Sequence, residues 1–507
     1  MACSKFFSGN LPELLNEVIQ YFHYDYKTLH SCILVNRLWC RLAIPLLWED
    51  PFSIRFPKNY RFIEIYLCNL SDDDKTRLNK YVIHSGLFPS NTLFNYPKFI
   101  QHLDTYKVSD SIKTWASTNL PTSHIVNFIT ELIVSFGVII KNYEEFECFD
   151  AAFELILQNT NFVHNIKSLT LDFDSKITDN ITKFLEFLCS NCNSISSLYF
   201  LLPIINYYHP IIEKNLSQMI KLQKNLKKIS FSHNCPLSLL LSLKNPNCTN
   251  TLNTIIFYSI DFKNINVLLS ELFNQLNVLE SIHIVYYESL EPLIQRSGNC
   301  LENFNINNYK SQQLLQSLKL YCRNIKFLSI ELHYQNVDLI FNLIKNIRQN
   351  LNYLIINSDG KIKFSLILLH NLGQILPFKL EYLRLVLAIK GSDLEVFLKS
   401  SQNTYIKKLS IRNAKNEGTS QDILPYIKEY IVKKKRVKYL AILDVFCGKK
   451  VDLFSLKDEV KEFQLYDIQV LDYYDSIINI YDFINNSYWL AGVKYRGVTR
   501  YFIHHNQ

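Results

Sequence analysis

The sequence predicts an α/β fold in which a short helical module precedes a solenoid of repeated strand-and-helix units. Three observations predict it. The first fifty residues have helical apolar spacing, a six-residue phrase recurs along most of the chain, and 48% of the 507 residues are hydrophobic. That composition supports a large core, and 11 Gly and 14 Pro are too few for a collagen-like or linker-dominated chain.

The recurring phrase has apolar residues at positions 1, 4 and 6. It starts at Ile166, Ile195, Leu226, Leu252, Leu279, Leu301, Ile325, Leu351, Leu380, Ile406 and Val437, with a twelfth candidate at Val460. Ten steps separate the first start from the eleventh, so the mean step is about 27 residues. This is the leucine-rich-repeat signature, a strand with positions 4 and 6 in the core and then a return segment. We expect a curved solenoid with a parallel sheet inside and helices outside.

Strand alternation places positions 3, 5 and 7 on the concave face of such a solenoid. Solenoids bind partners on that face, and aromatic and arginine residues dominate interface hot spots. The sequence therefore predicts a substrate-binding surface made of Tyr199, Tyr258, Phe327, Tyr353, Tyr382, Arg384, Arg412 and Tyr439. Stacking of neighbouring aromatics for stability alone is the alternative that stays open.

Helical spacing marks the amino-terminal segment, where the apolar residues from Leu11 to Phe22 share one helical face and Pro12 suits the first turn. We expect a second helix from an N-cap at Thr28 to Leu42, and a third short one from Ile44 to Trp48. About 40 residues cannot form a stable core alone. Packing onto the rest of the chain and docking on a partner are the two open explanations.

These residues resemble an F-box. The matching positions are Leu11, Pro12, Leu15, Ile19, Leu29, Cys32, Val35, Asn36, Arg37, Trp39, Leu47 and Trp48. The resemblance implies a helical platform that docks on a Skp-type linker and attaches the chain to a cullin ligase core. It implies that linker binding depends on Leu11, Pro12, Leu15, Ile19, Val35 and Trp39. Cysteines just before a phrase, namely Cys192, Cys248, Cys300 and Cys322, resemble the buried thiols of repeats behind F-boxes.

We expect four segments. They are an F-box-like module at 1–52, a mainly helical linker and cap at 53–160, a solenoid of 11 to 12 repeats at 161–486, and a carboxyl-terminal cap at 487–507. A helical pattern from Ser71 supports the second.

The formal net charge of +8 raises a nucleic-acid hypothesis, but the basic residues are scattered. The dense run at 433–438 is interpreted as a solvated face rather than a localisation or phosphate-contact patch, so we expect no nucleic-acid partner. The opening MACSKFFSGN has no signal-peptide run, and the apolar stretches are shorter than a membrane span. We expect a cytoplasmic or nuclear protein with reduced cysteines and no membrane association.

Catalytic motifs for nucleotide, zinc-protease or serine-hydrolase chemistry are missing from the sequence. Cys189 and Cys192 form a lone CSNC without a second ligand pair, so we expect neither a metal, nor a cofactor, nor an enzyme. The resemblance implies a substrate-recognition adaptor of a Skp–cullin–F-box ubiquitin ligase, whose solenoid binds a protein substrate. The main alternative is a repeat scaffold without a ligase role, in which the amino-terminal helices cap the solenoid. A third is nucleic-acid binding.

Overall fold

The computed structural model describes residues 12–54, 60–68, 92–118, 163–172, 179–201, 210–232, 236–262, 266–288, 290–306, 312–332, 337–358, 362–415, 423–446 and 449–484. Short gaps fall at 24, 105–106, 109–110, 112–113, 116–117, 433, 479 and 481–482. The chain forms two compact units, described separately below. Unit 1 consists mainly of residues 1–260 and unit 2 mainly of residues 280–488.

Unit 1 begins with three helices: α2 (Pro12–Tyr21), α3 (Tyr26–Cys32) and α4 (Arg37–Leu47). Their apolar faces share a core made of Leu15, Ile19, Leu29, Cys32, Trp39, Ala43 and Leu46. The predicted helical module is therefore present as three packed helices.

The helix boundaries in this module differ from the expected ones. The N-cap of α3 is Asp25, whose Oδ1 accepts a hydrogen bond from the Thr28 backbone N at 3.1 Å, and not Thr28 itself. The second predicted helix is broken because Asn36 Oδ1 accepts from Leu38 N and Trp39 N, which starts a new helix. The third predicted segment, from Ile44, simply continues α4.

The stretch expected to be a helical linker is mixed in its described parts. It contains η1 (Pro51–Ser53), α5 (Phe62–Cys68), η4 (Tyr96–Phe99) and the strand β1 (His102–Asp104). The pattern from Ser71 lies outside the described residues. The strand was not expected, and Ile100 and Leu103 are buried like positions 1 and 4 of a phrase. Thr105 at position 6 breaks the apolar pattern.

The sheet of unit 1 is parallel and follows the chain order. After β1 come β2 (Ser168–Asp172), β3 (Ser197–Leu201), β4 (Lys228–Ser232) and β5 (Thr254–Asp261). The helices between them are α10 (Asp179–Asn191), α11 (Pro210–Leu222), α12 (Leu237–Ser242) and α13 (Pro246–Thr249). Position 4 of each phrase is aligned with position 4 of the next, as Leu169, Leu198, Ile229 and Ile255.

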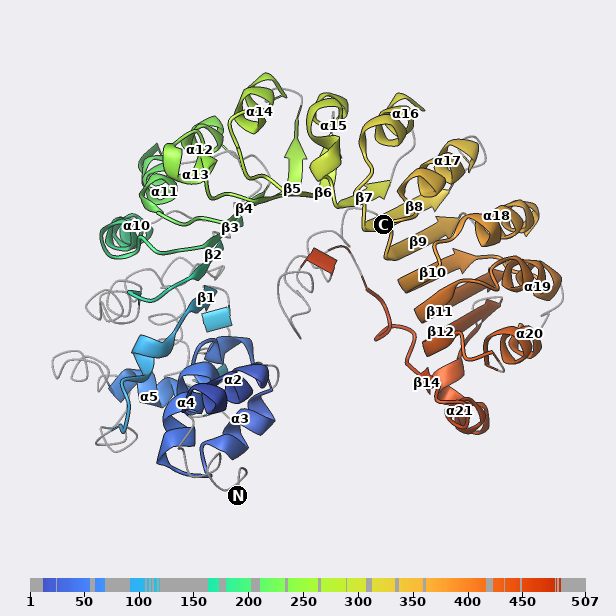
Figure 1. The fold of residues 1–507 in the computed structure, drawn as a ribbon, viewed down its shortest axis with the longest axis horizontal. Coiled ribbons are helices and arrows are strands. Elements are labelled where there is room, and N and C mark those ends of the chain that lie inside the picture. The colour runs from blue at the N-terminus through green and yellow to red at the C-terminus, as the bar shows by residue number, and fades with distance from the viewer. Residues whose placement is uncertain are drawn as a thin grey trace. The chain divides into compact units, whose positions relative to one another are not determined.

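The parallel repeat continues in unit 2, beyond α14 (Asn266–Phe273). Its strands are β6 (Ser281–Glu288), β7 (Asn303–Ile306), β8 (Phe327–Leu332), β9 (Tyr353–Ser358), β10 (Lys379–Leu387), β11 (Tyr405–Lys415) and β12 (Val437–Phe446). The intervening helical segments are α15 (Glu291–Ser297), η8 (Gly298–Cys300), α16 (Gln312–Tyr321), α17 (Val337–Ile347), α18 (Ile362–Ile375), α19 (Gly391–Ser400), α20 (Leu424–Ile427) and the π-helical η10 (Lys428–Val432). Figure 1 shows α16 to α19 on one side of β7 to β12. Position 4 is again in register, as Phe304, Leu328, Leu354, Leu383, Leu409 and Leu440.

The end of the repeat differs from the sequence prediction. The twelfth candidate phrase, from Val460, lies in the helix α21 (Lys457–Gln464), whose first turn contains Asp458 and Glu459. Acidic residues in a first turn favour a helix, and this explains why the phrase is not a strand. The β12 edge instead pairs with β13 (Lys449–Asp452), antiparallel, and with the short parallel β14 (Gln469–Val470), with η11 (Leu453–Ser455) between them. In the described part of the chain, no helix is long and apolar enough to cross a membrane.

Helices α18 and α19 pack closely at Gly373. A Cβ there would meet Ser400 Oγ and would lie 3.0 Å from the Phe397 carbonyl oxygen. Gly373→Ala should therefore lower the free energy of unfolding by about 1 to 3 kcal/mol, despite the better helix propensity of alanine. Chemical denaturation measures this, with the exposed neighbour Gln374→Ala as the control. A stability equal to or above that of the wild type would contradict the close packing.

Candidate interaction surfaces

The face of the unit 2 strands opposite their helices is covered in part by the chain itself. We call this face, formed by positions 3, 5 and 7 of β6 to β12, the strand face. We call residues 471–484, which follow β14, the return segment. Figure 1 shows it in orange and red on the strand side of the sheet. Its contacts run from β12 back to β6 and are described in that order.

Tyr473 anchors the start of the return segment. It is buried against Ala441 and Leu443 of β12. Its hydroxyl oxygen accepts a hydrogen bond from Arg384 Nε at 3.2 Å, and the guanidinium carbon lies 5.8 Å from the ring centroid. Its backbone N donates to Asp452 Oδ2 at 3.0 Å. Apolar burial and a charge-assisted hydrogen bond therefore fix Tyr473 on the strand face.

Hydroxyl groups make the middle contacts. The Oγ atoms of Ser476 and Ser410 lie 3.1 Å apart and are buried. The backbone N of Ile478 donates to the Tyr382 hydroxyl oxygen at 3.3 Å. Burial raises the pKa of Tyr382 to about 12, so its hydroxyl is neutral and accepts this bond at physiological pH.

Phe483 fills the far end of the strand face. Its ring centroid lies 5.1 Å from that of Phe327, 5.2 Å from that of Tyr353 and 6.2 Å from that of His283. Such spacings are typical of stabilising aromatic pairs. Ile480 and Ile484 are buried as well. The segment thus makes both polar and aromatic contacts along the face.

The predicted substrate-binding residues of this face differ in exposure, and substrate binding by them stays a prediction. Phe327 and Tyr382 are fully buried, while Tyr353, Arg384, Arg412 and Tyr439 are half-buried. A signal existed in the sequence, because Tyr473, Ile477, Ile480 and Phe483 recur at helical spacing after the repeat ends. Helical periodicity identifies the apolar side of a segment, but it does not identify the surface on which that side packs.

The corresponding face of unit 1 is also buried. Tyr199 is largely buried, Tyr258 is half-buried, and burial raises the pKa of Tyr258. Lys228 is 5% exposed, and burial lowers its pKa to about 7. Its Nζ lies 5.3 Å from the Tyr199 ring centroid, in cation–π contact. Tyr199 and Lys228 are therefore interior groups, whereas Tyr258 is only partly covered.

The predicted linker-binding residues divide between the interior and surface of the helical module. Leu15, Ile19 and Trp39 are buried in its core, so they shape the module instead of contacting a partner directly. Val35 is 53% exposed. Leu11 lies outside the described residues, and Pro12 begins α2.

Other apolar side chains, outside the predicted linker-binding set, are exposed on the same module. Leu34, beside Val35 in the turn between α3 and α4, is 75% exposed. Leu14 and Tyr21, seven residues apart and so on the same face of α2, are exposed too. Large exposed apolar groups are the usual mark of a partner surface when they gather on one small module.

Glu49 ties the end of this module to the sheet. Its Oε2 lies 3.0 Å from His23 Nε2 and its Oε1 lies 2.9 Å from His102 Nε2, while its carbonyl oxygen accepts from the Gln101 and His102 backbone N atoms. Burial alone would raise the pKa of Glu49, but hydrogen bonds and charge from His102 and His23 outweigh it and keep that pKa below its ordinary value. Trp48 packs on Tyr96 beside this contact, with the rings tilted by 43° and their centroids 4.2 Å apart.

Of the four cysteines that precede a phrase, Cys192, Cys248 and Cys322 are buried, as predicted, and Cys300 is half-buried. Cys192 Sγ donates to the Val163 carbonyl oxygen at 3.0 Å and Cys189 Sγ to that of Asn215 at 3.4 Å. Burial raises the pKa of Cys192 to about 12. Within the described residues, no group of three or more His, Cys, Asp or Glu is arranged to hold a metal ion.

The basic run at 433–438 does not form one solvated face. Arg436 is buried and donates to the carbonyl oxygens of Leu398, Ser401 and Thr404 at the end of α19. Lys434 and Lys435 are exposed, and Lys435 pairs with Asp467 at 3.4 Å. Arg436 therefore completes the end of a helix.

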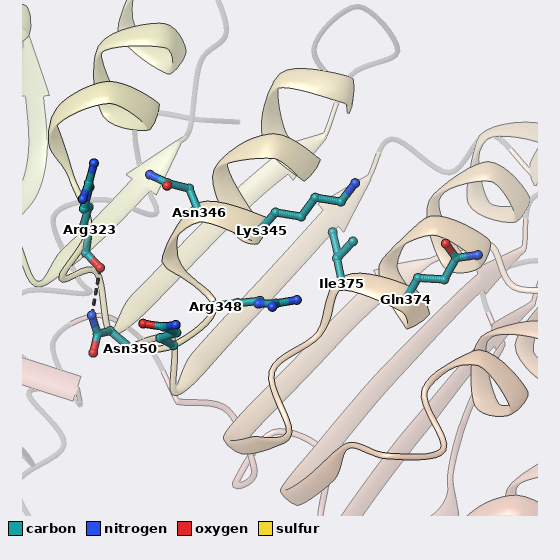
Figure 2. Close-up of a pocket in the computed structure, with 8 residues that line it drawn as sticks. Arg323, Lys345, Asn346, Arg348, Asn350, Gln374 and Ile375 are labelled. Carbon is teal, nitrogen blue, oxygen red and sulfur yellow. Dashed lines mark hydrogen bonds between the residues drawn. The ribbon is translucent and has the colours of Figure 1, made fainter.

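A basic hollow of about 440 Å³ lies on the helix side of unit 2, at the carboxyl ends of α16 to α18 (Figure 2). Its cations are Arg323, Lys345 and Arg348. Figure 2 shows Lys345 and Arg348 at the end of α17 and Arg323 just past α16, with the three side chains not meeting at one point. Asn350 Nδ2 donates to the Arg323 carbonyl oxygen at 3.0 Å. Cations are stabilised at helix carboxyl ends, which accounts for their position.

Comparison with known proteins identifies no family. No protein-family model and no curated protein matches the chain. Among solved structures, the leucine-rich-repeat-containing protein LegL7 from Legionella pneumophila is similar at 14% identity and a TM-score of 0.33. The match covers 65% of this chain and 96% of that one. The repeat assignment rests on the phrase register and the parallel sheets, which define a leucine-rich-repeat-like α/β protein with an amino-terminal helical module.

Replacing Glu49 tests the contact between the module and the sheet. Glu49→Gln should lower the free energy of unfolding by about 1 to 3 kcal/mol at pH 7, because it removes a buried charge-assisted hydrogen-bond acceptor. The native pKa of Glu49 lies below the ordinary 4.5, so the wild-type advantage is complete above pH 4.5 and is lost as the pH falls through the native value. Denaturation at several pH values measures it, with the exposed Glu17→Gln as the control. An advantage that stays constant down to pH 3 would contradict the assignment.

Proposed function

We propose that this protein is a substrate-recruiting adaptor of a cullin-based ubiquitin ligase, in which the amino-terminal module binds a Skp-type linker and the repeats recognise a protein substrate. The observation that carries the proposal is a three-helix module with its own core and exposed apolar side chains on α2 and in the α3–α4 turn. The resemblance of the same residues to an F-box supports it.

The contact geometry of the module is consistent with such a role. The end of α4 packs on the sheet through Trp48 and Glu49, which fixes the module to the rest of unit 1. Leu14, Tyr21, Leu34 and Val35 are left at its surface. A firmly attached platform suits an adaptor, since the adaptor holds its partner at a defined place relative to the repeats.

An adaptor of this kind performs no bond chemistry and needs no cofactor. It raises the effective concentration of substrate lysines near the ligase, an intramolecular gain that reaches the millimolar range with short connections. The proposal places the protein in the cytoplasm or nucleus, with a linker, the cullin core and a protein substrate as partners.

A repeat scaffold without a ligase role is the second candidate. The packing of Trp48 and Glu49 against Tyr96 and His102 favours it, because these contacts would also be made by helices that serve only as a cap of the sheet. The two candidates differ in whether the exposed apolar residues of the module bind anything.

Linker capture by the full-length chain distinguishes them. The wild type should co-purify with a Skp-type linker, and Leu34→Asp or Val35→Asp should weaken that binding at least tenfold, because each places a charge in an apolar interface. Leu320→Asp on α16, where the leucine is 64% exposed, is the matched control and should bind as the wild type does.

Trp39→Ala should change the stability of the module as well as its binding. It should lower the stability of the module by about 3 to 5 kcal/mol and weaken binding through that loss, because Trp39 is a core residue. A folded wild type that captures no linker would leave the scaffold as the better candidate.

A further inference from the structure

The strand face of unit 2 is occupied through side chains and not through an extended sheet. One main-chain bond joins the return segment to β12, from Leu471 N to the Leu440 carbonyl oxygen at 2.8 Å. Beyond Leu471, its described contacts involve side chains: the Tyr473 backbone bond to Asp452, two hydroxyl hydrogen bonds, one arginine hydrogen bond, and apolar and aromatic packing. A segment held this way can leave without disturbing the ladder between β7 and β12. The face therefore has the properties of a binding site with a ligand in it.

The two sides of the return segment differ in burial and polarity. Tyr473, Ser476 and Phe483 face the sheet and are buried or paired there. Tyr474 and Asp475, between them, are exposed. Asp472 closes the turn, since its Oδ1 accepts from the Tyr474 and Asp475 backbone N atoms. One-sided contact by a turn or helix is a recurring mode of peptide recognition.

We propose that the strand face of unit 2 binds a peptide segment of a protein partner with the contact pattern of the return segment, and that the return segment occupies this site until the partner displaces it. The pattern is a tyrosine, a serine three residues later, aliphatic residues at four and seven, and an aromatic residue at ten, with the acidic Asp475 on the outer side. Arg384 and Ser410 recognise the hydroxyls, and the pocket of Phe327 and Tyr353 takes the aromatic ring.

Displacement follows from competition between a tethered and a free ligand. A tethered segment acts at an effective concentration in the millimolar range, and the apparent affinity for a partner falls by the fraction of molecules in which the face is open. Weakening the return segment should then strengthen partner binding, whereas weakening the face should reduce it. If the return segment had only a structural role, weakening it would not strengthen partner binding.

The test uses the full-length chain and a fluorescent synthetic peptide of residues 470–484, with binding measured by anisotropy. The double variant Tyr473→Ala/Phe483→Ala should bind this peptide at least tenfold more tightly than the wild type. Adding Arg384→Gln to the double variant should remove most of the gain. A peptide with aspartate at the position of Phe483 should bind none of the proteins.

Controls keep the result interpretable. Asp475→Ala, an exposed change in the same segment, should bind peptide as the wild type does. If the double variant does not fold by circular dichroism, Phe483→Leu, which nearly preserves volume, replaces it and should gain about threefold. A folded variant with no gain, or a gain that survives Arg384→Gln, overturns the proposal.

A further outcome identifies a different occupant. Concentration-dependent dimerisation of the double variant, seen by light scattering without peptide, would assign the site to a second copy of the chain and overturn the proposal. This inference deepens the proposed recognition role of the repeats. It does not depend on linker capture by the helical module. A negative result in either experiment therefore leaves the other experiment interpretable.

Discussion

The alignment of one apolar side chain per repeat with its neighbours is the constraint on which the rest of the structure depends. Position 4 of each phrase lies beside position 4 of the next strand, from Leu169 to Ile255 in unit 1 and from Phe304 to Leu440 in unit 2. A single strand and helix cannot bury their own apolar faces, so each repeat is stabilised by its neighbours. Asparagines reinforce the stack outside the core. Asn324 and Asn350 each donate to a carbonyl one repeat earlier, at Asn299 and Arg323.

The sequence predicted the repeats well, because the information is local. A strand with inward residues at positions 4 and 6 has a period of two, and stacking then leaves little choice of register. The eleven phrases therefore lie on strands as expected. The strand β1 was missed because Thr105 interrupts its pattern, and Val460 was misplaced because apolar spacing alone does not separate a strand from a short helix with an acidic first turn.

The candidate sites were less predictable, because they depend on contacts between distant residues. Tyr382 and Phe327 were correctly placed on the face opposite the helices, but their burial depends on Ile478 and Phe483, about 100 and 150 residues away. Likewise Leu15 and Trp39 match a family pattern, and only the packing of three helices shows them to be interior. Arg436 belongs to a basic run in the sequence, yet its side chain is buried and donates hydrogen bonds to carbonyl groups at the end of α19.

The return segment also changes how unit 2 can fold. Repeats that touch only their neighbours have low contact order and can form one after another as the chain is made. Phe483 contacts His283, two hundred residues earlier. The contact between them forms only after both have been synthesised, so until then the aromatic residues of β6 to β12 lack the cover that the return segment provides. The return segment therefore adds long-range contacts, which slow folding, to a unit whose repeats otherwise contact only their neighbours.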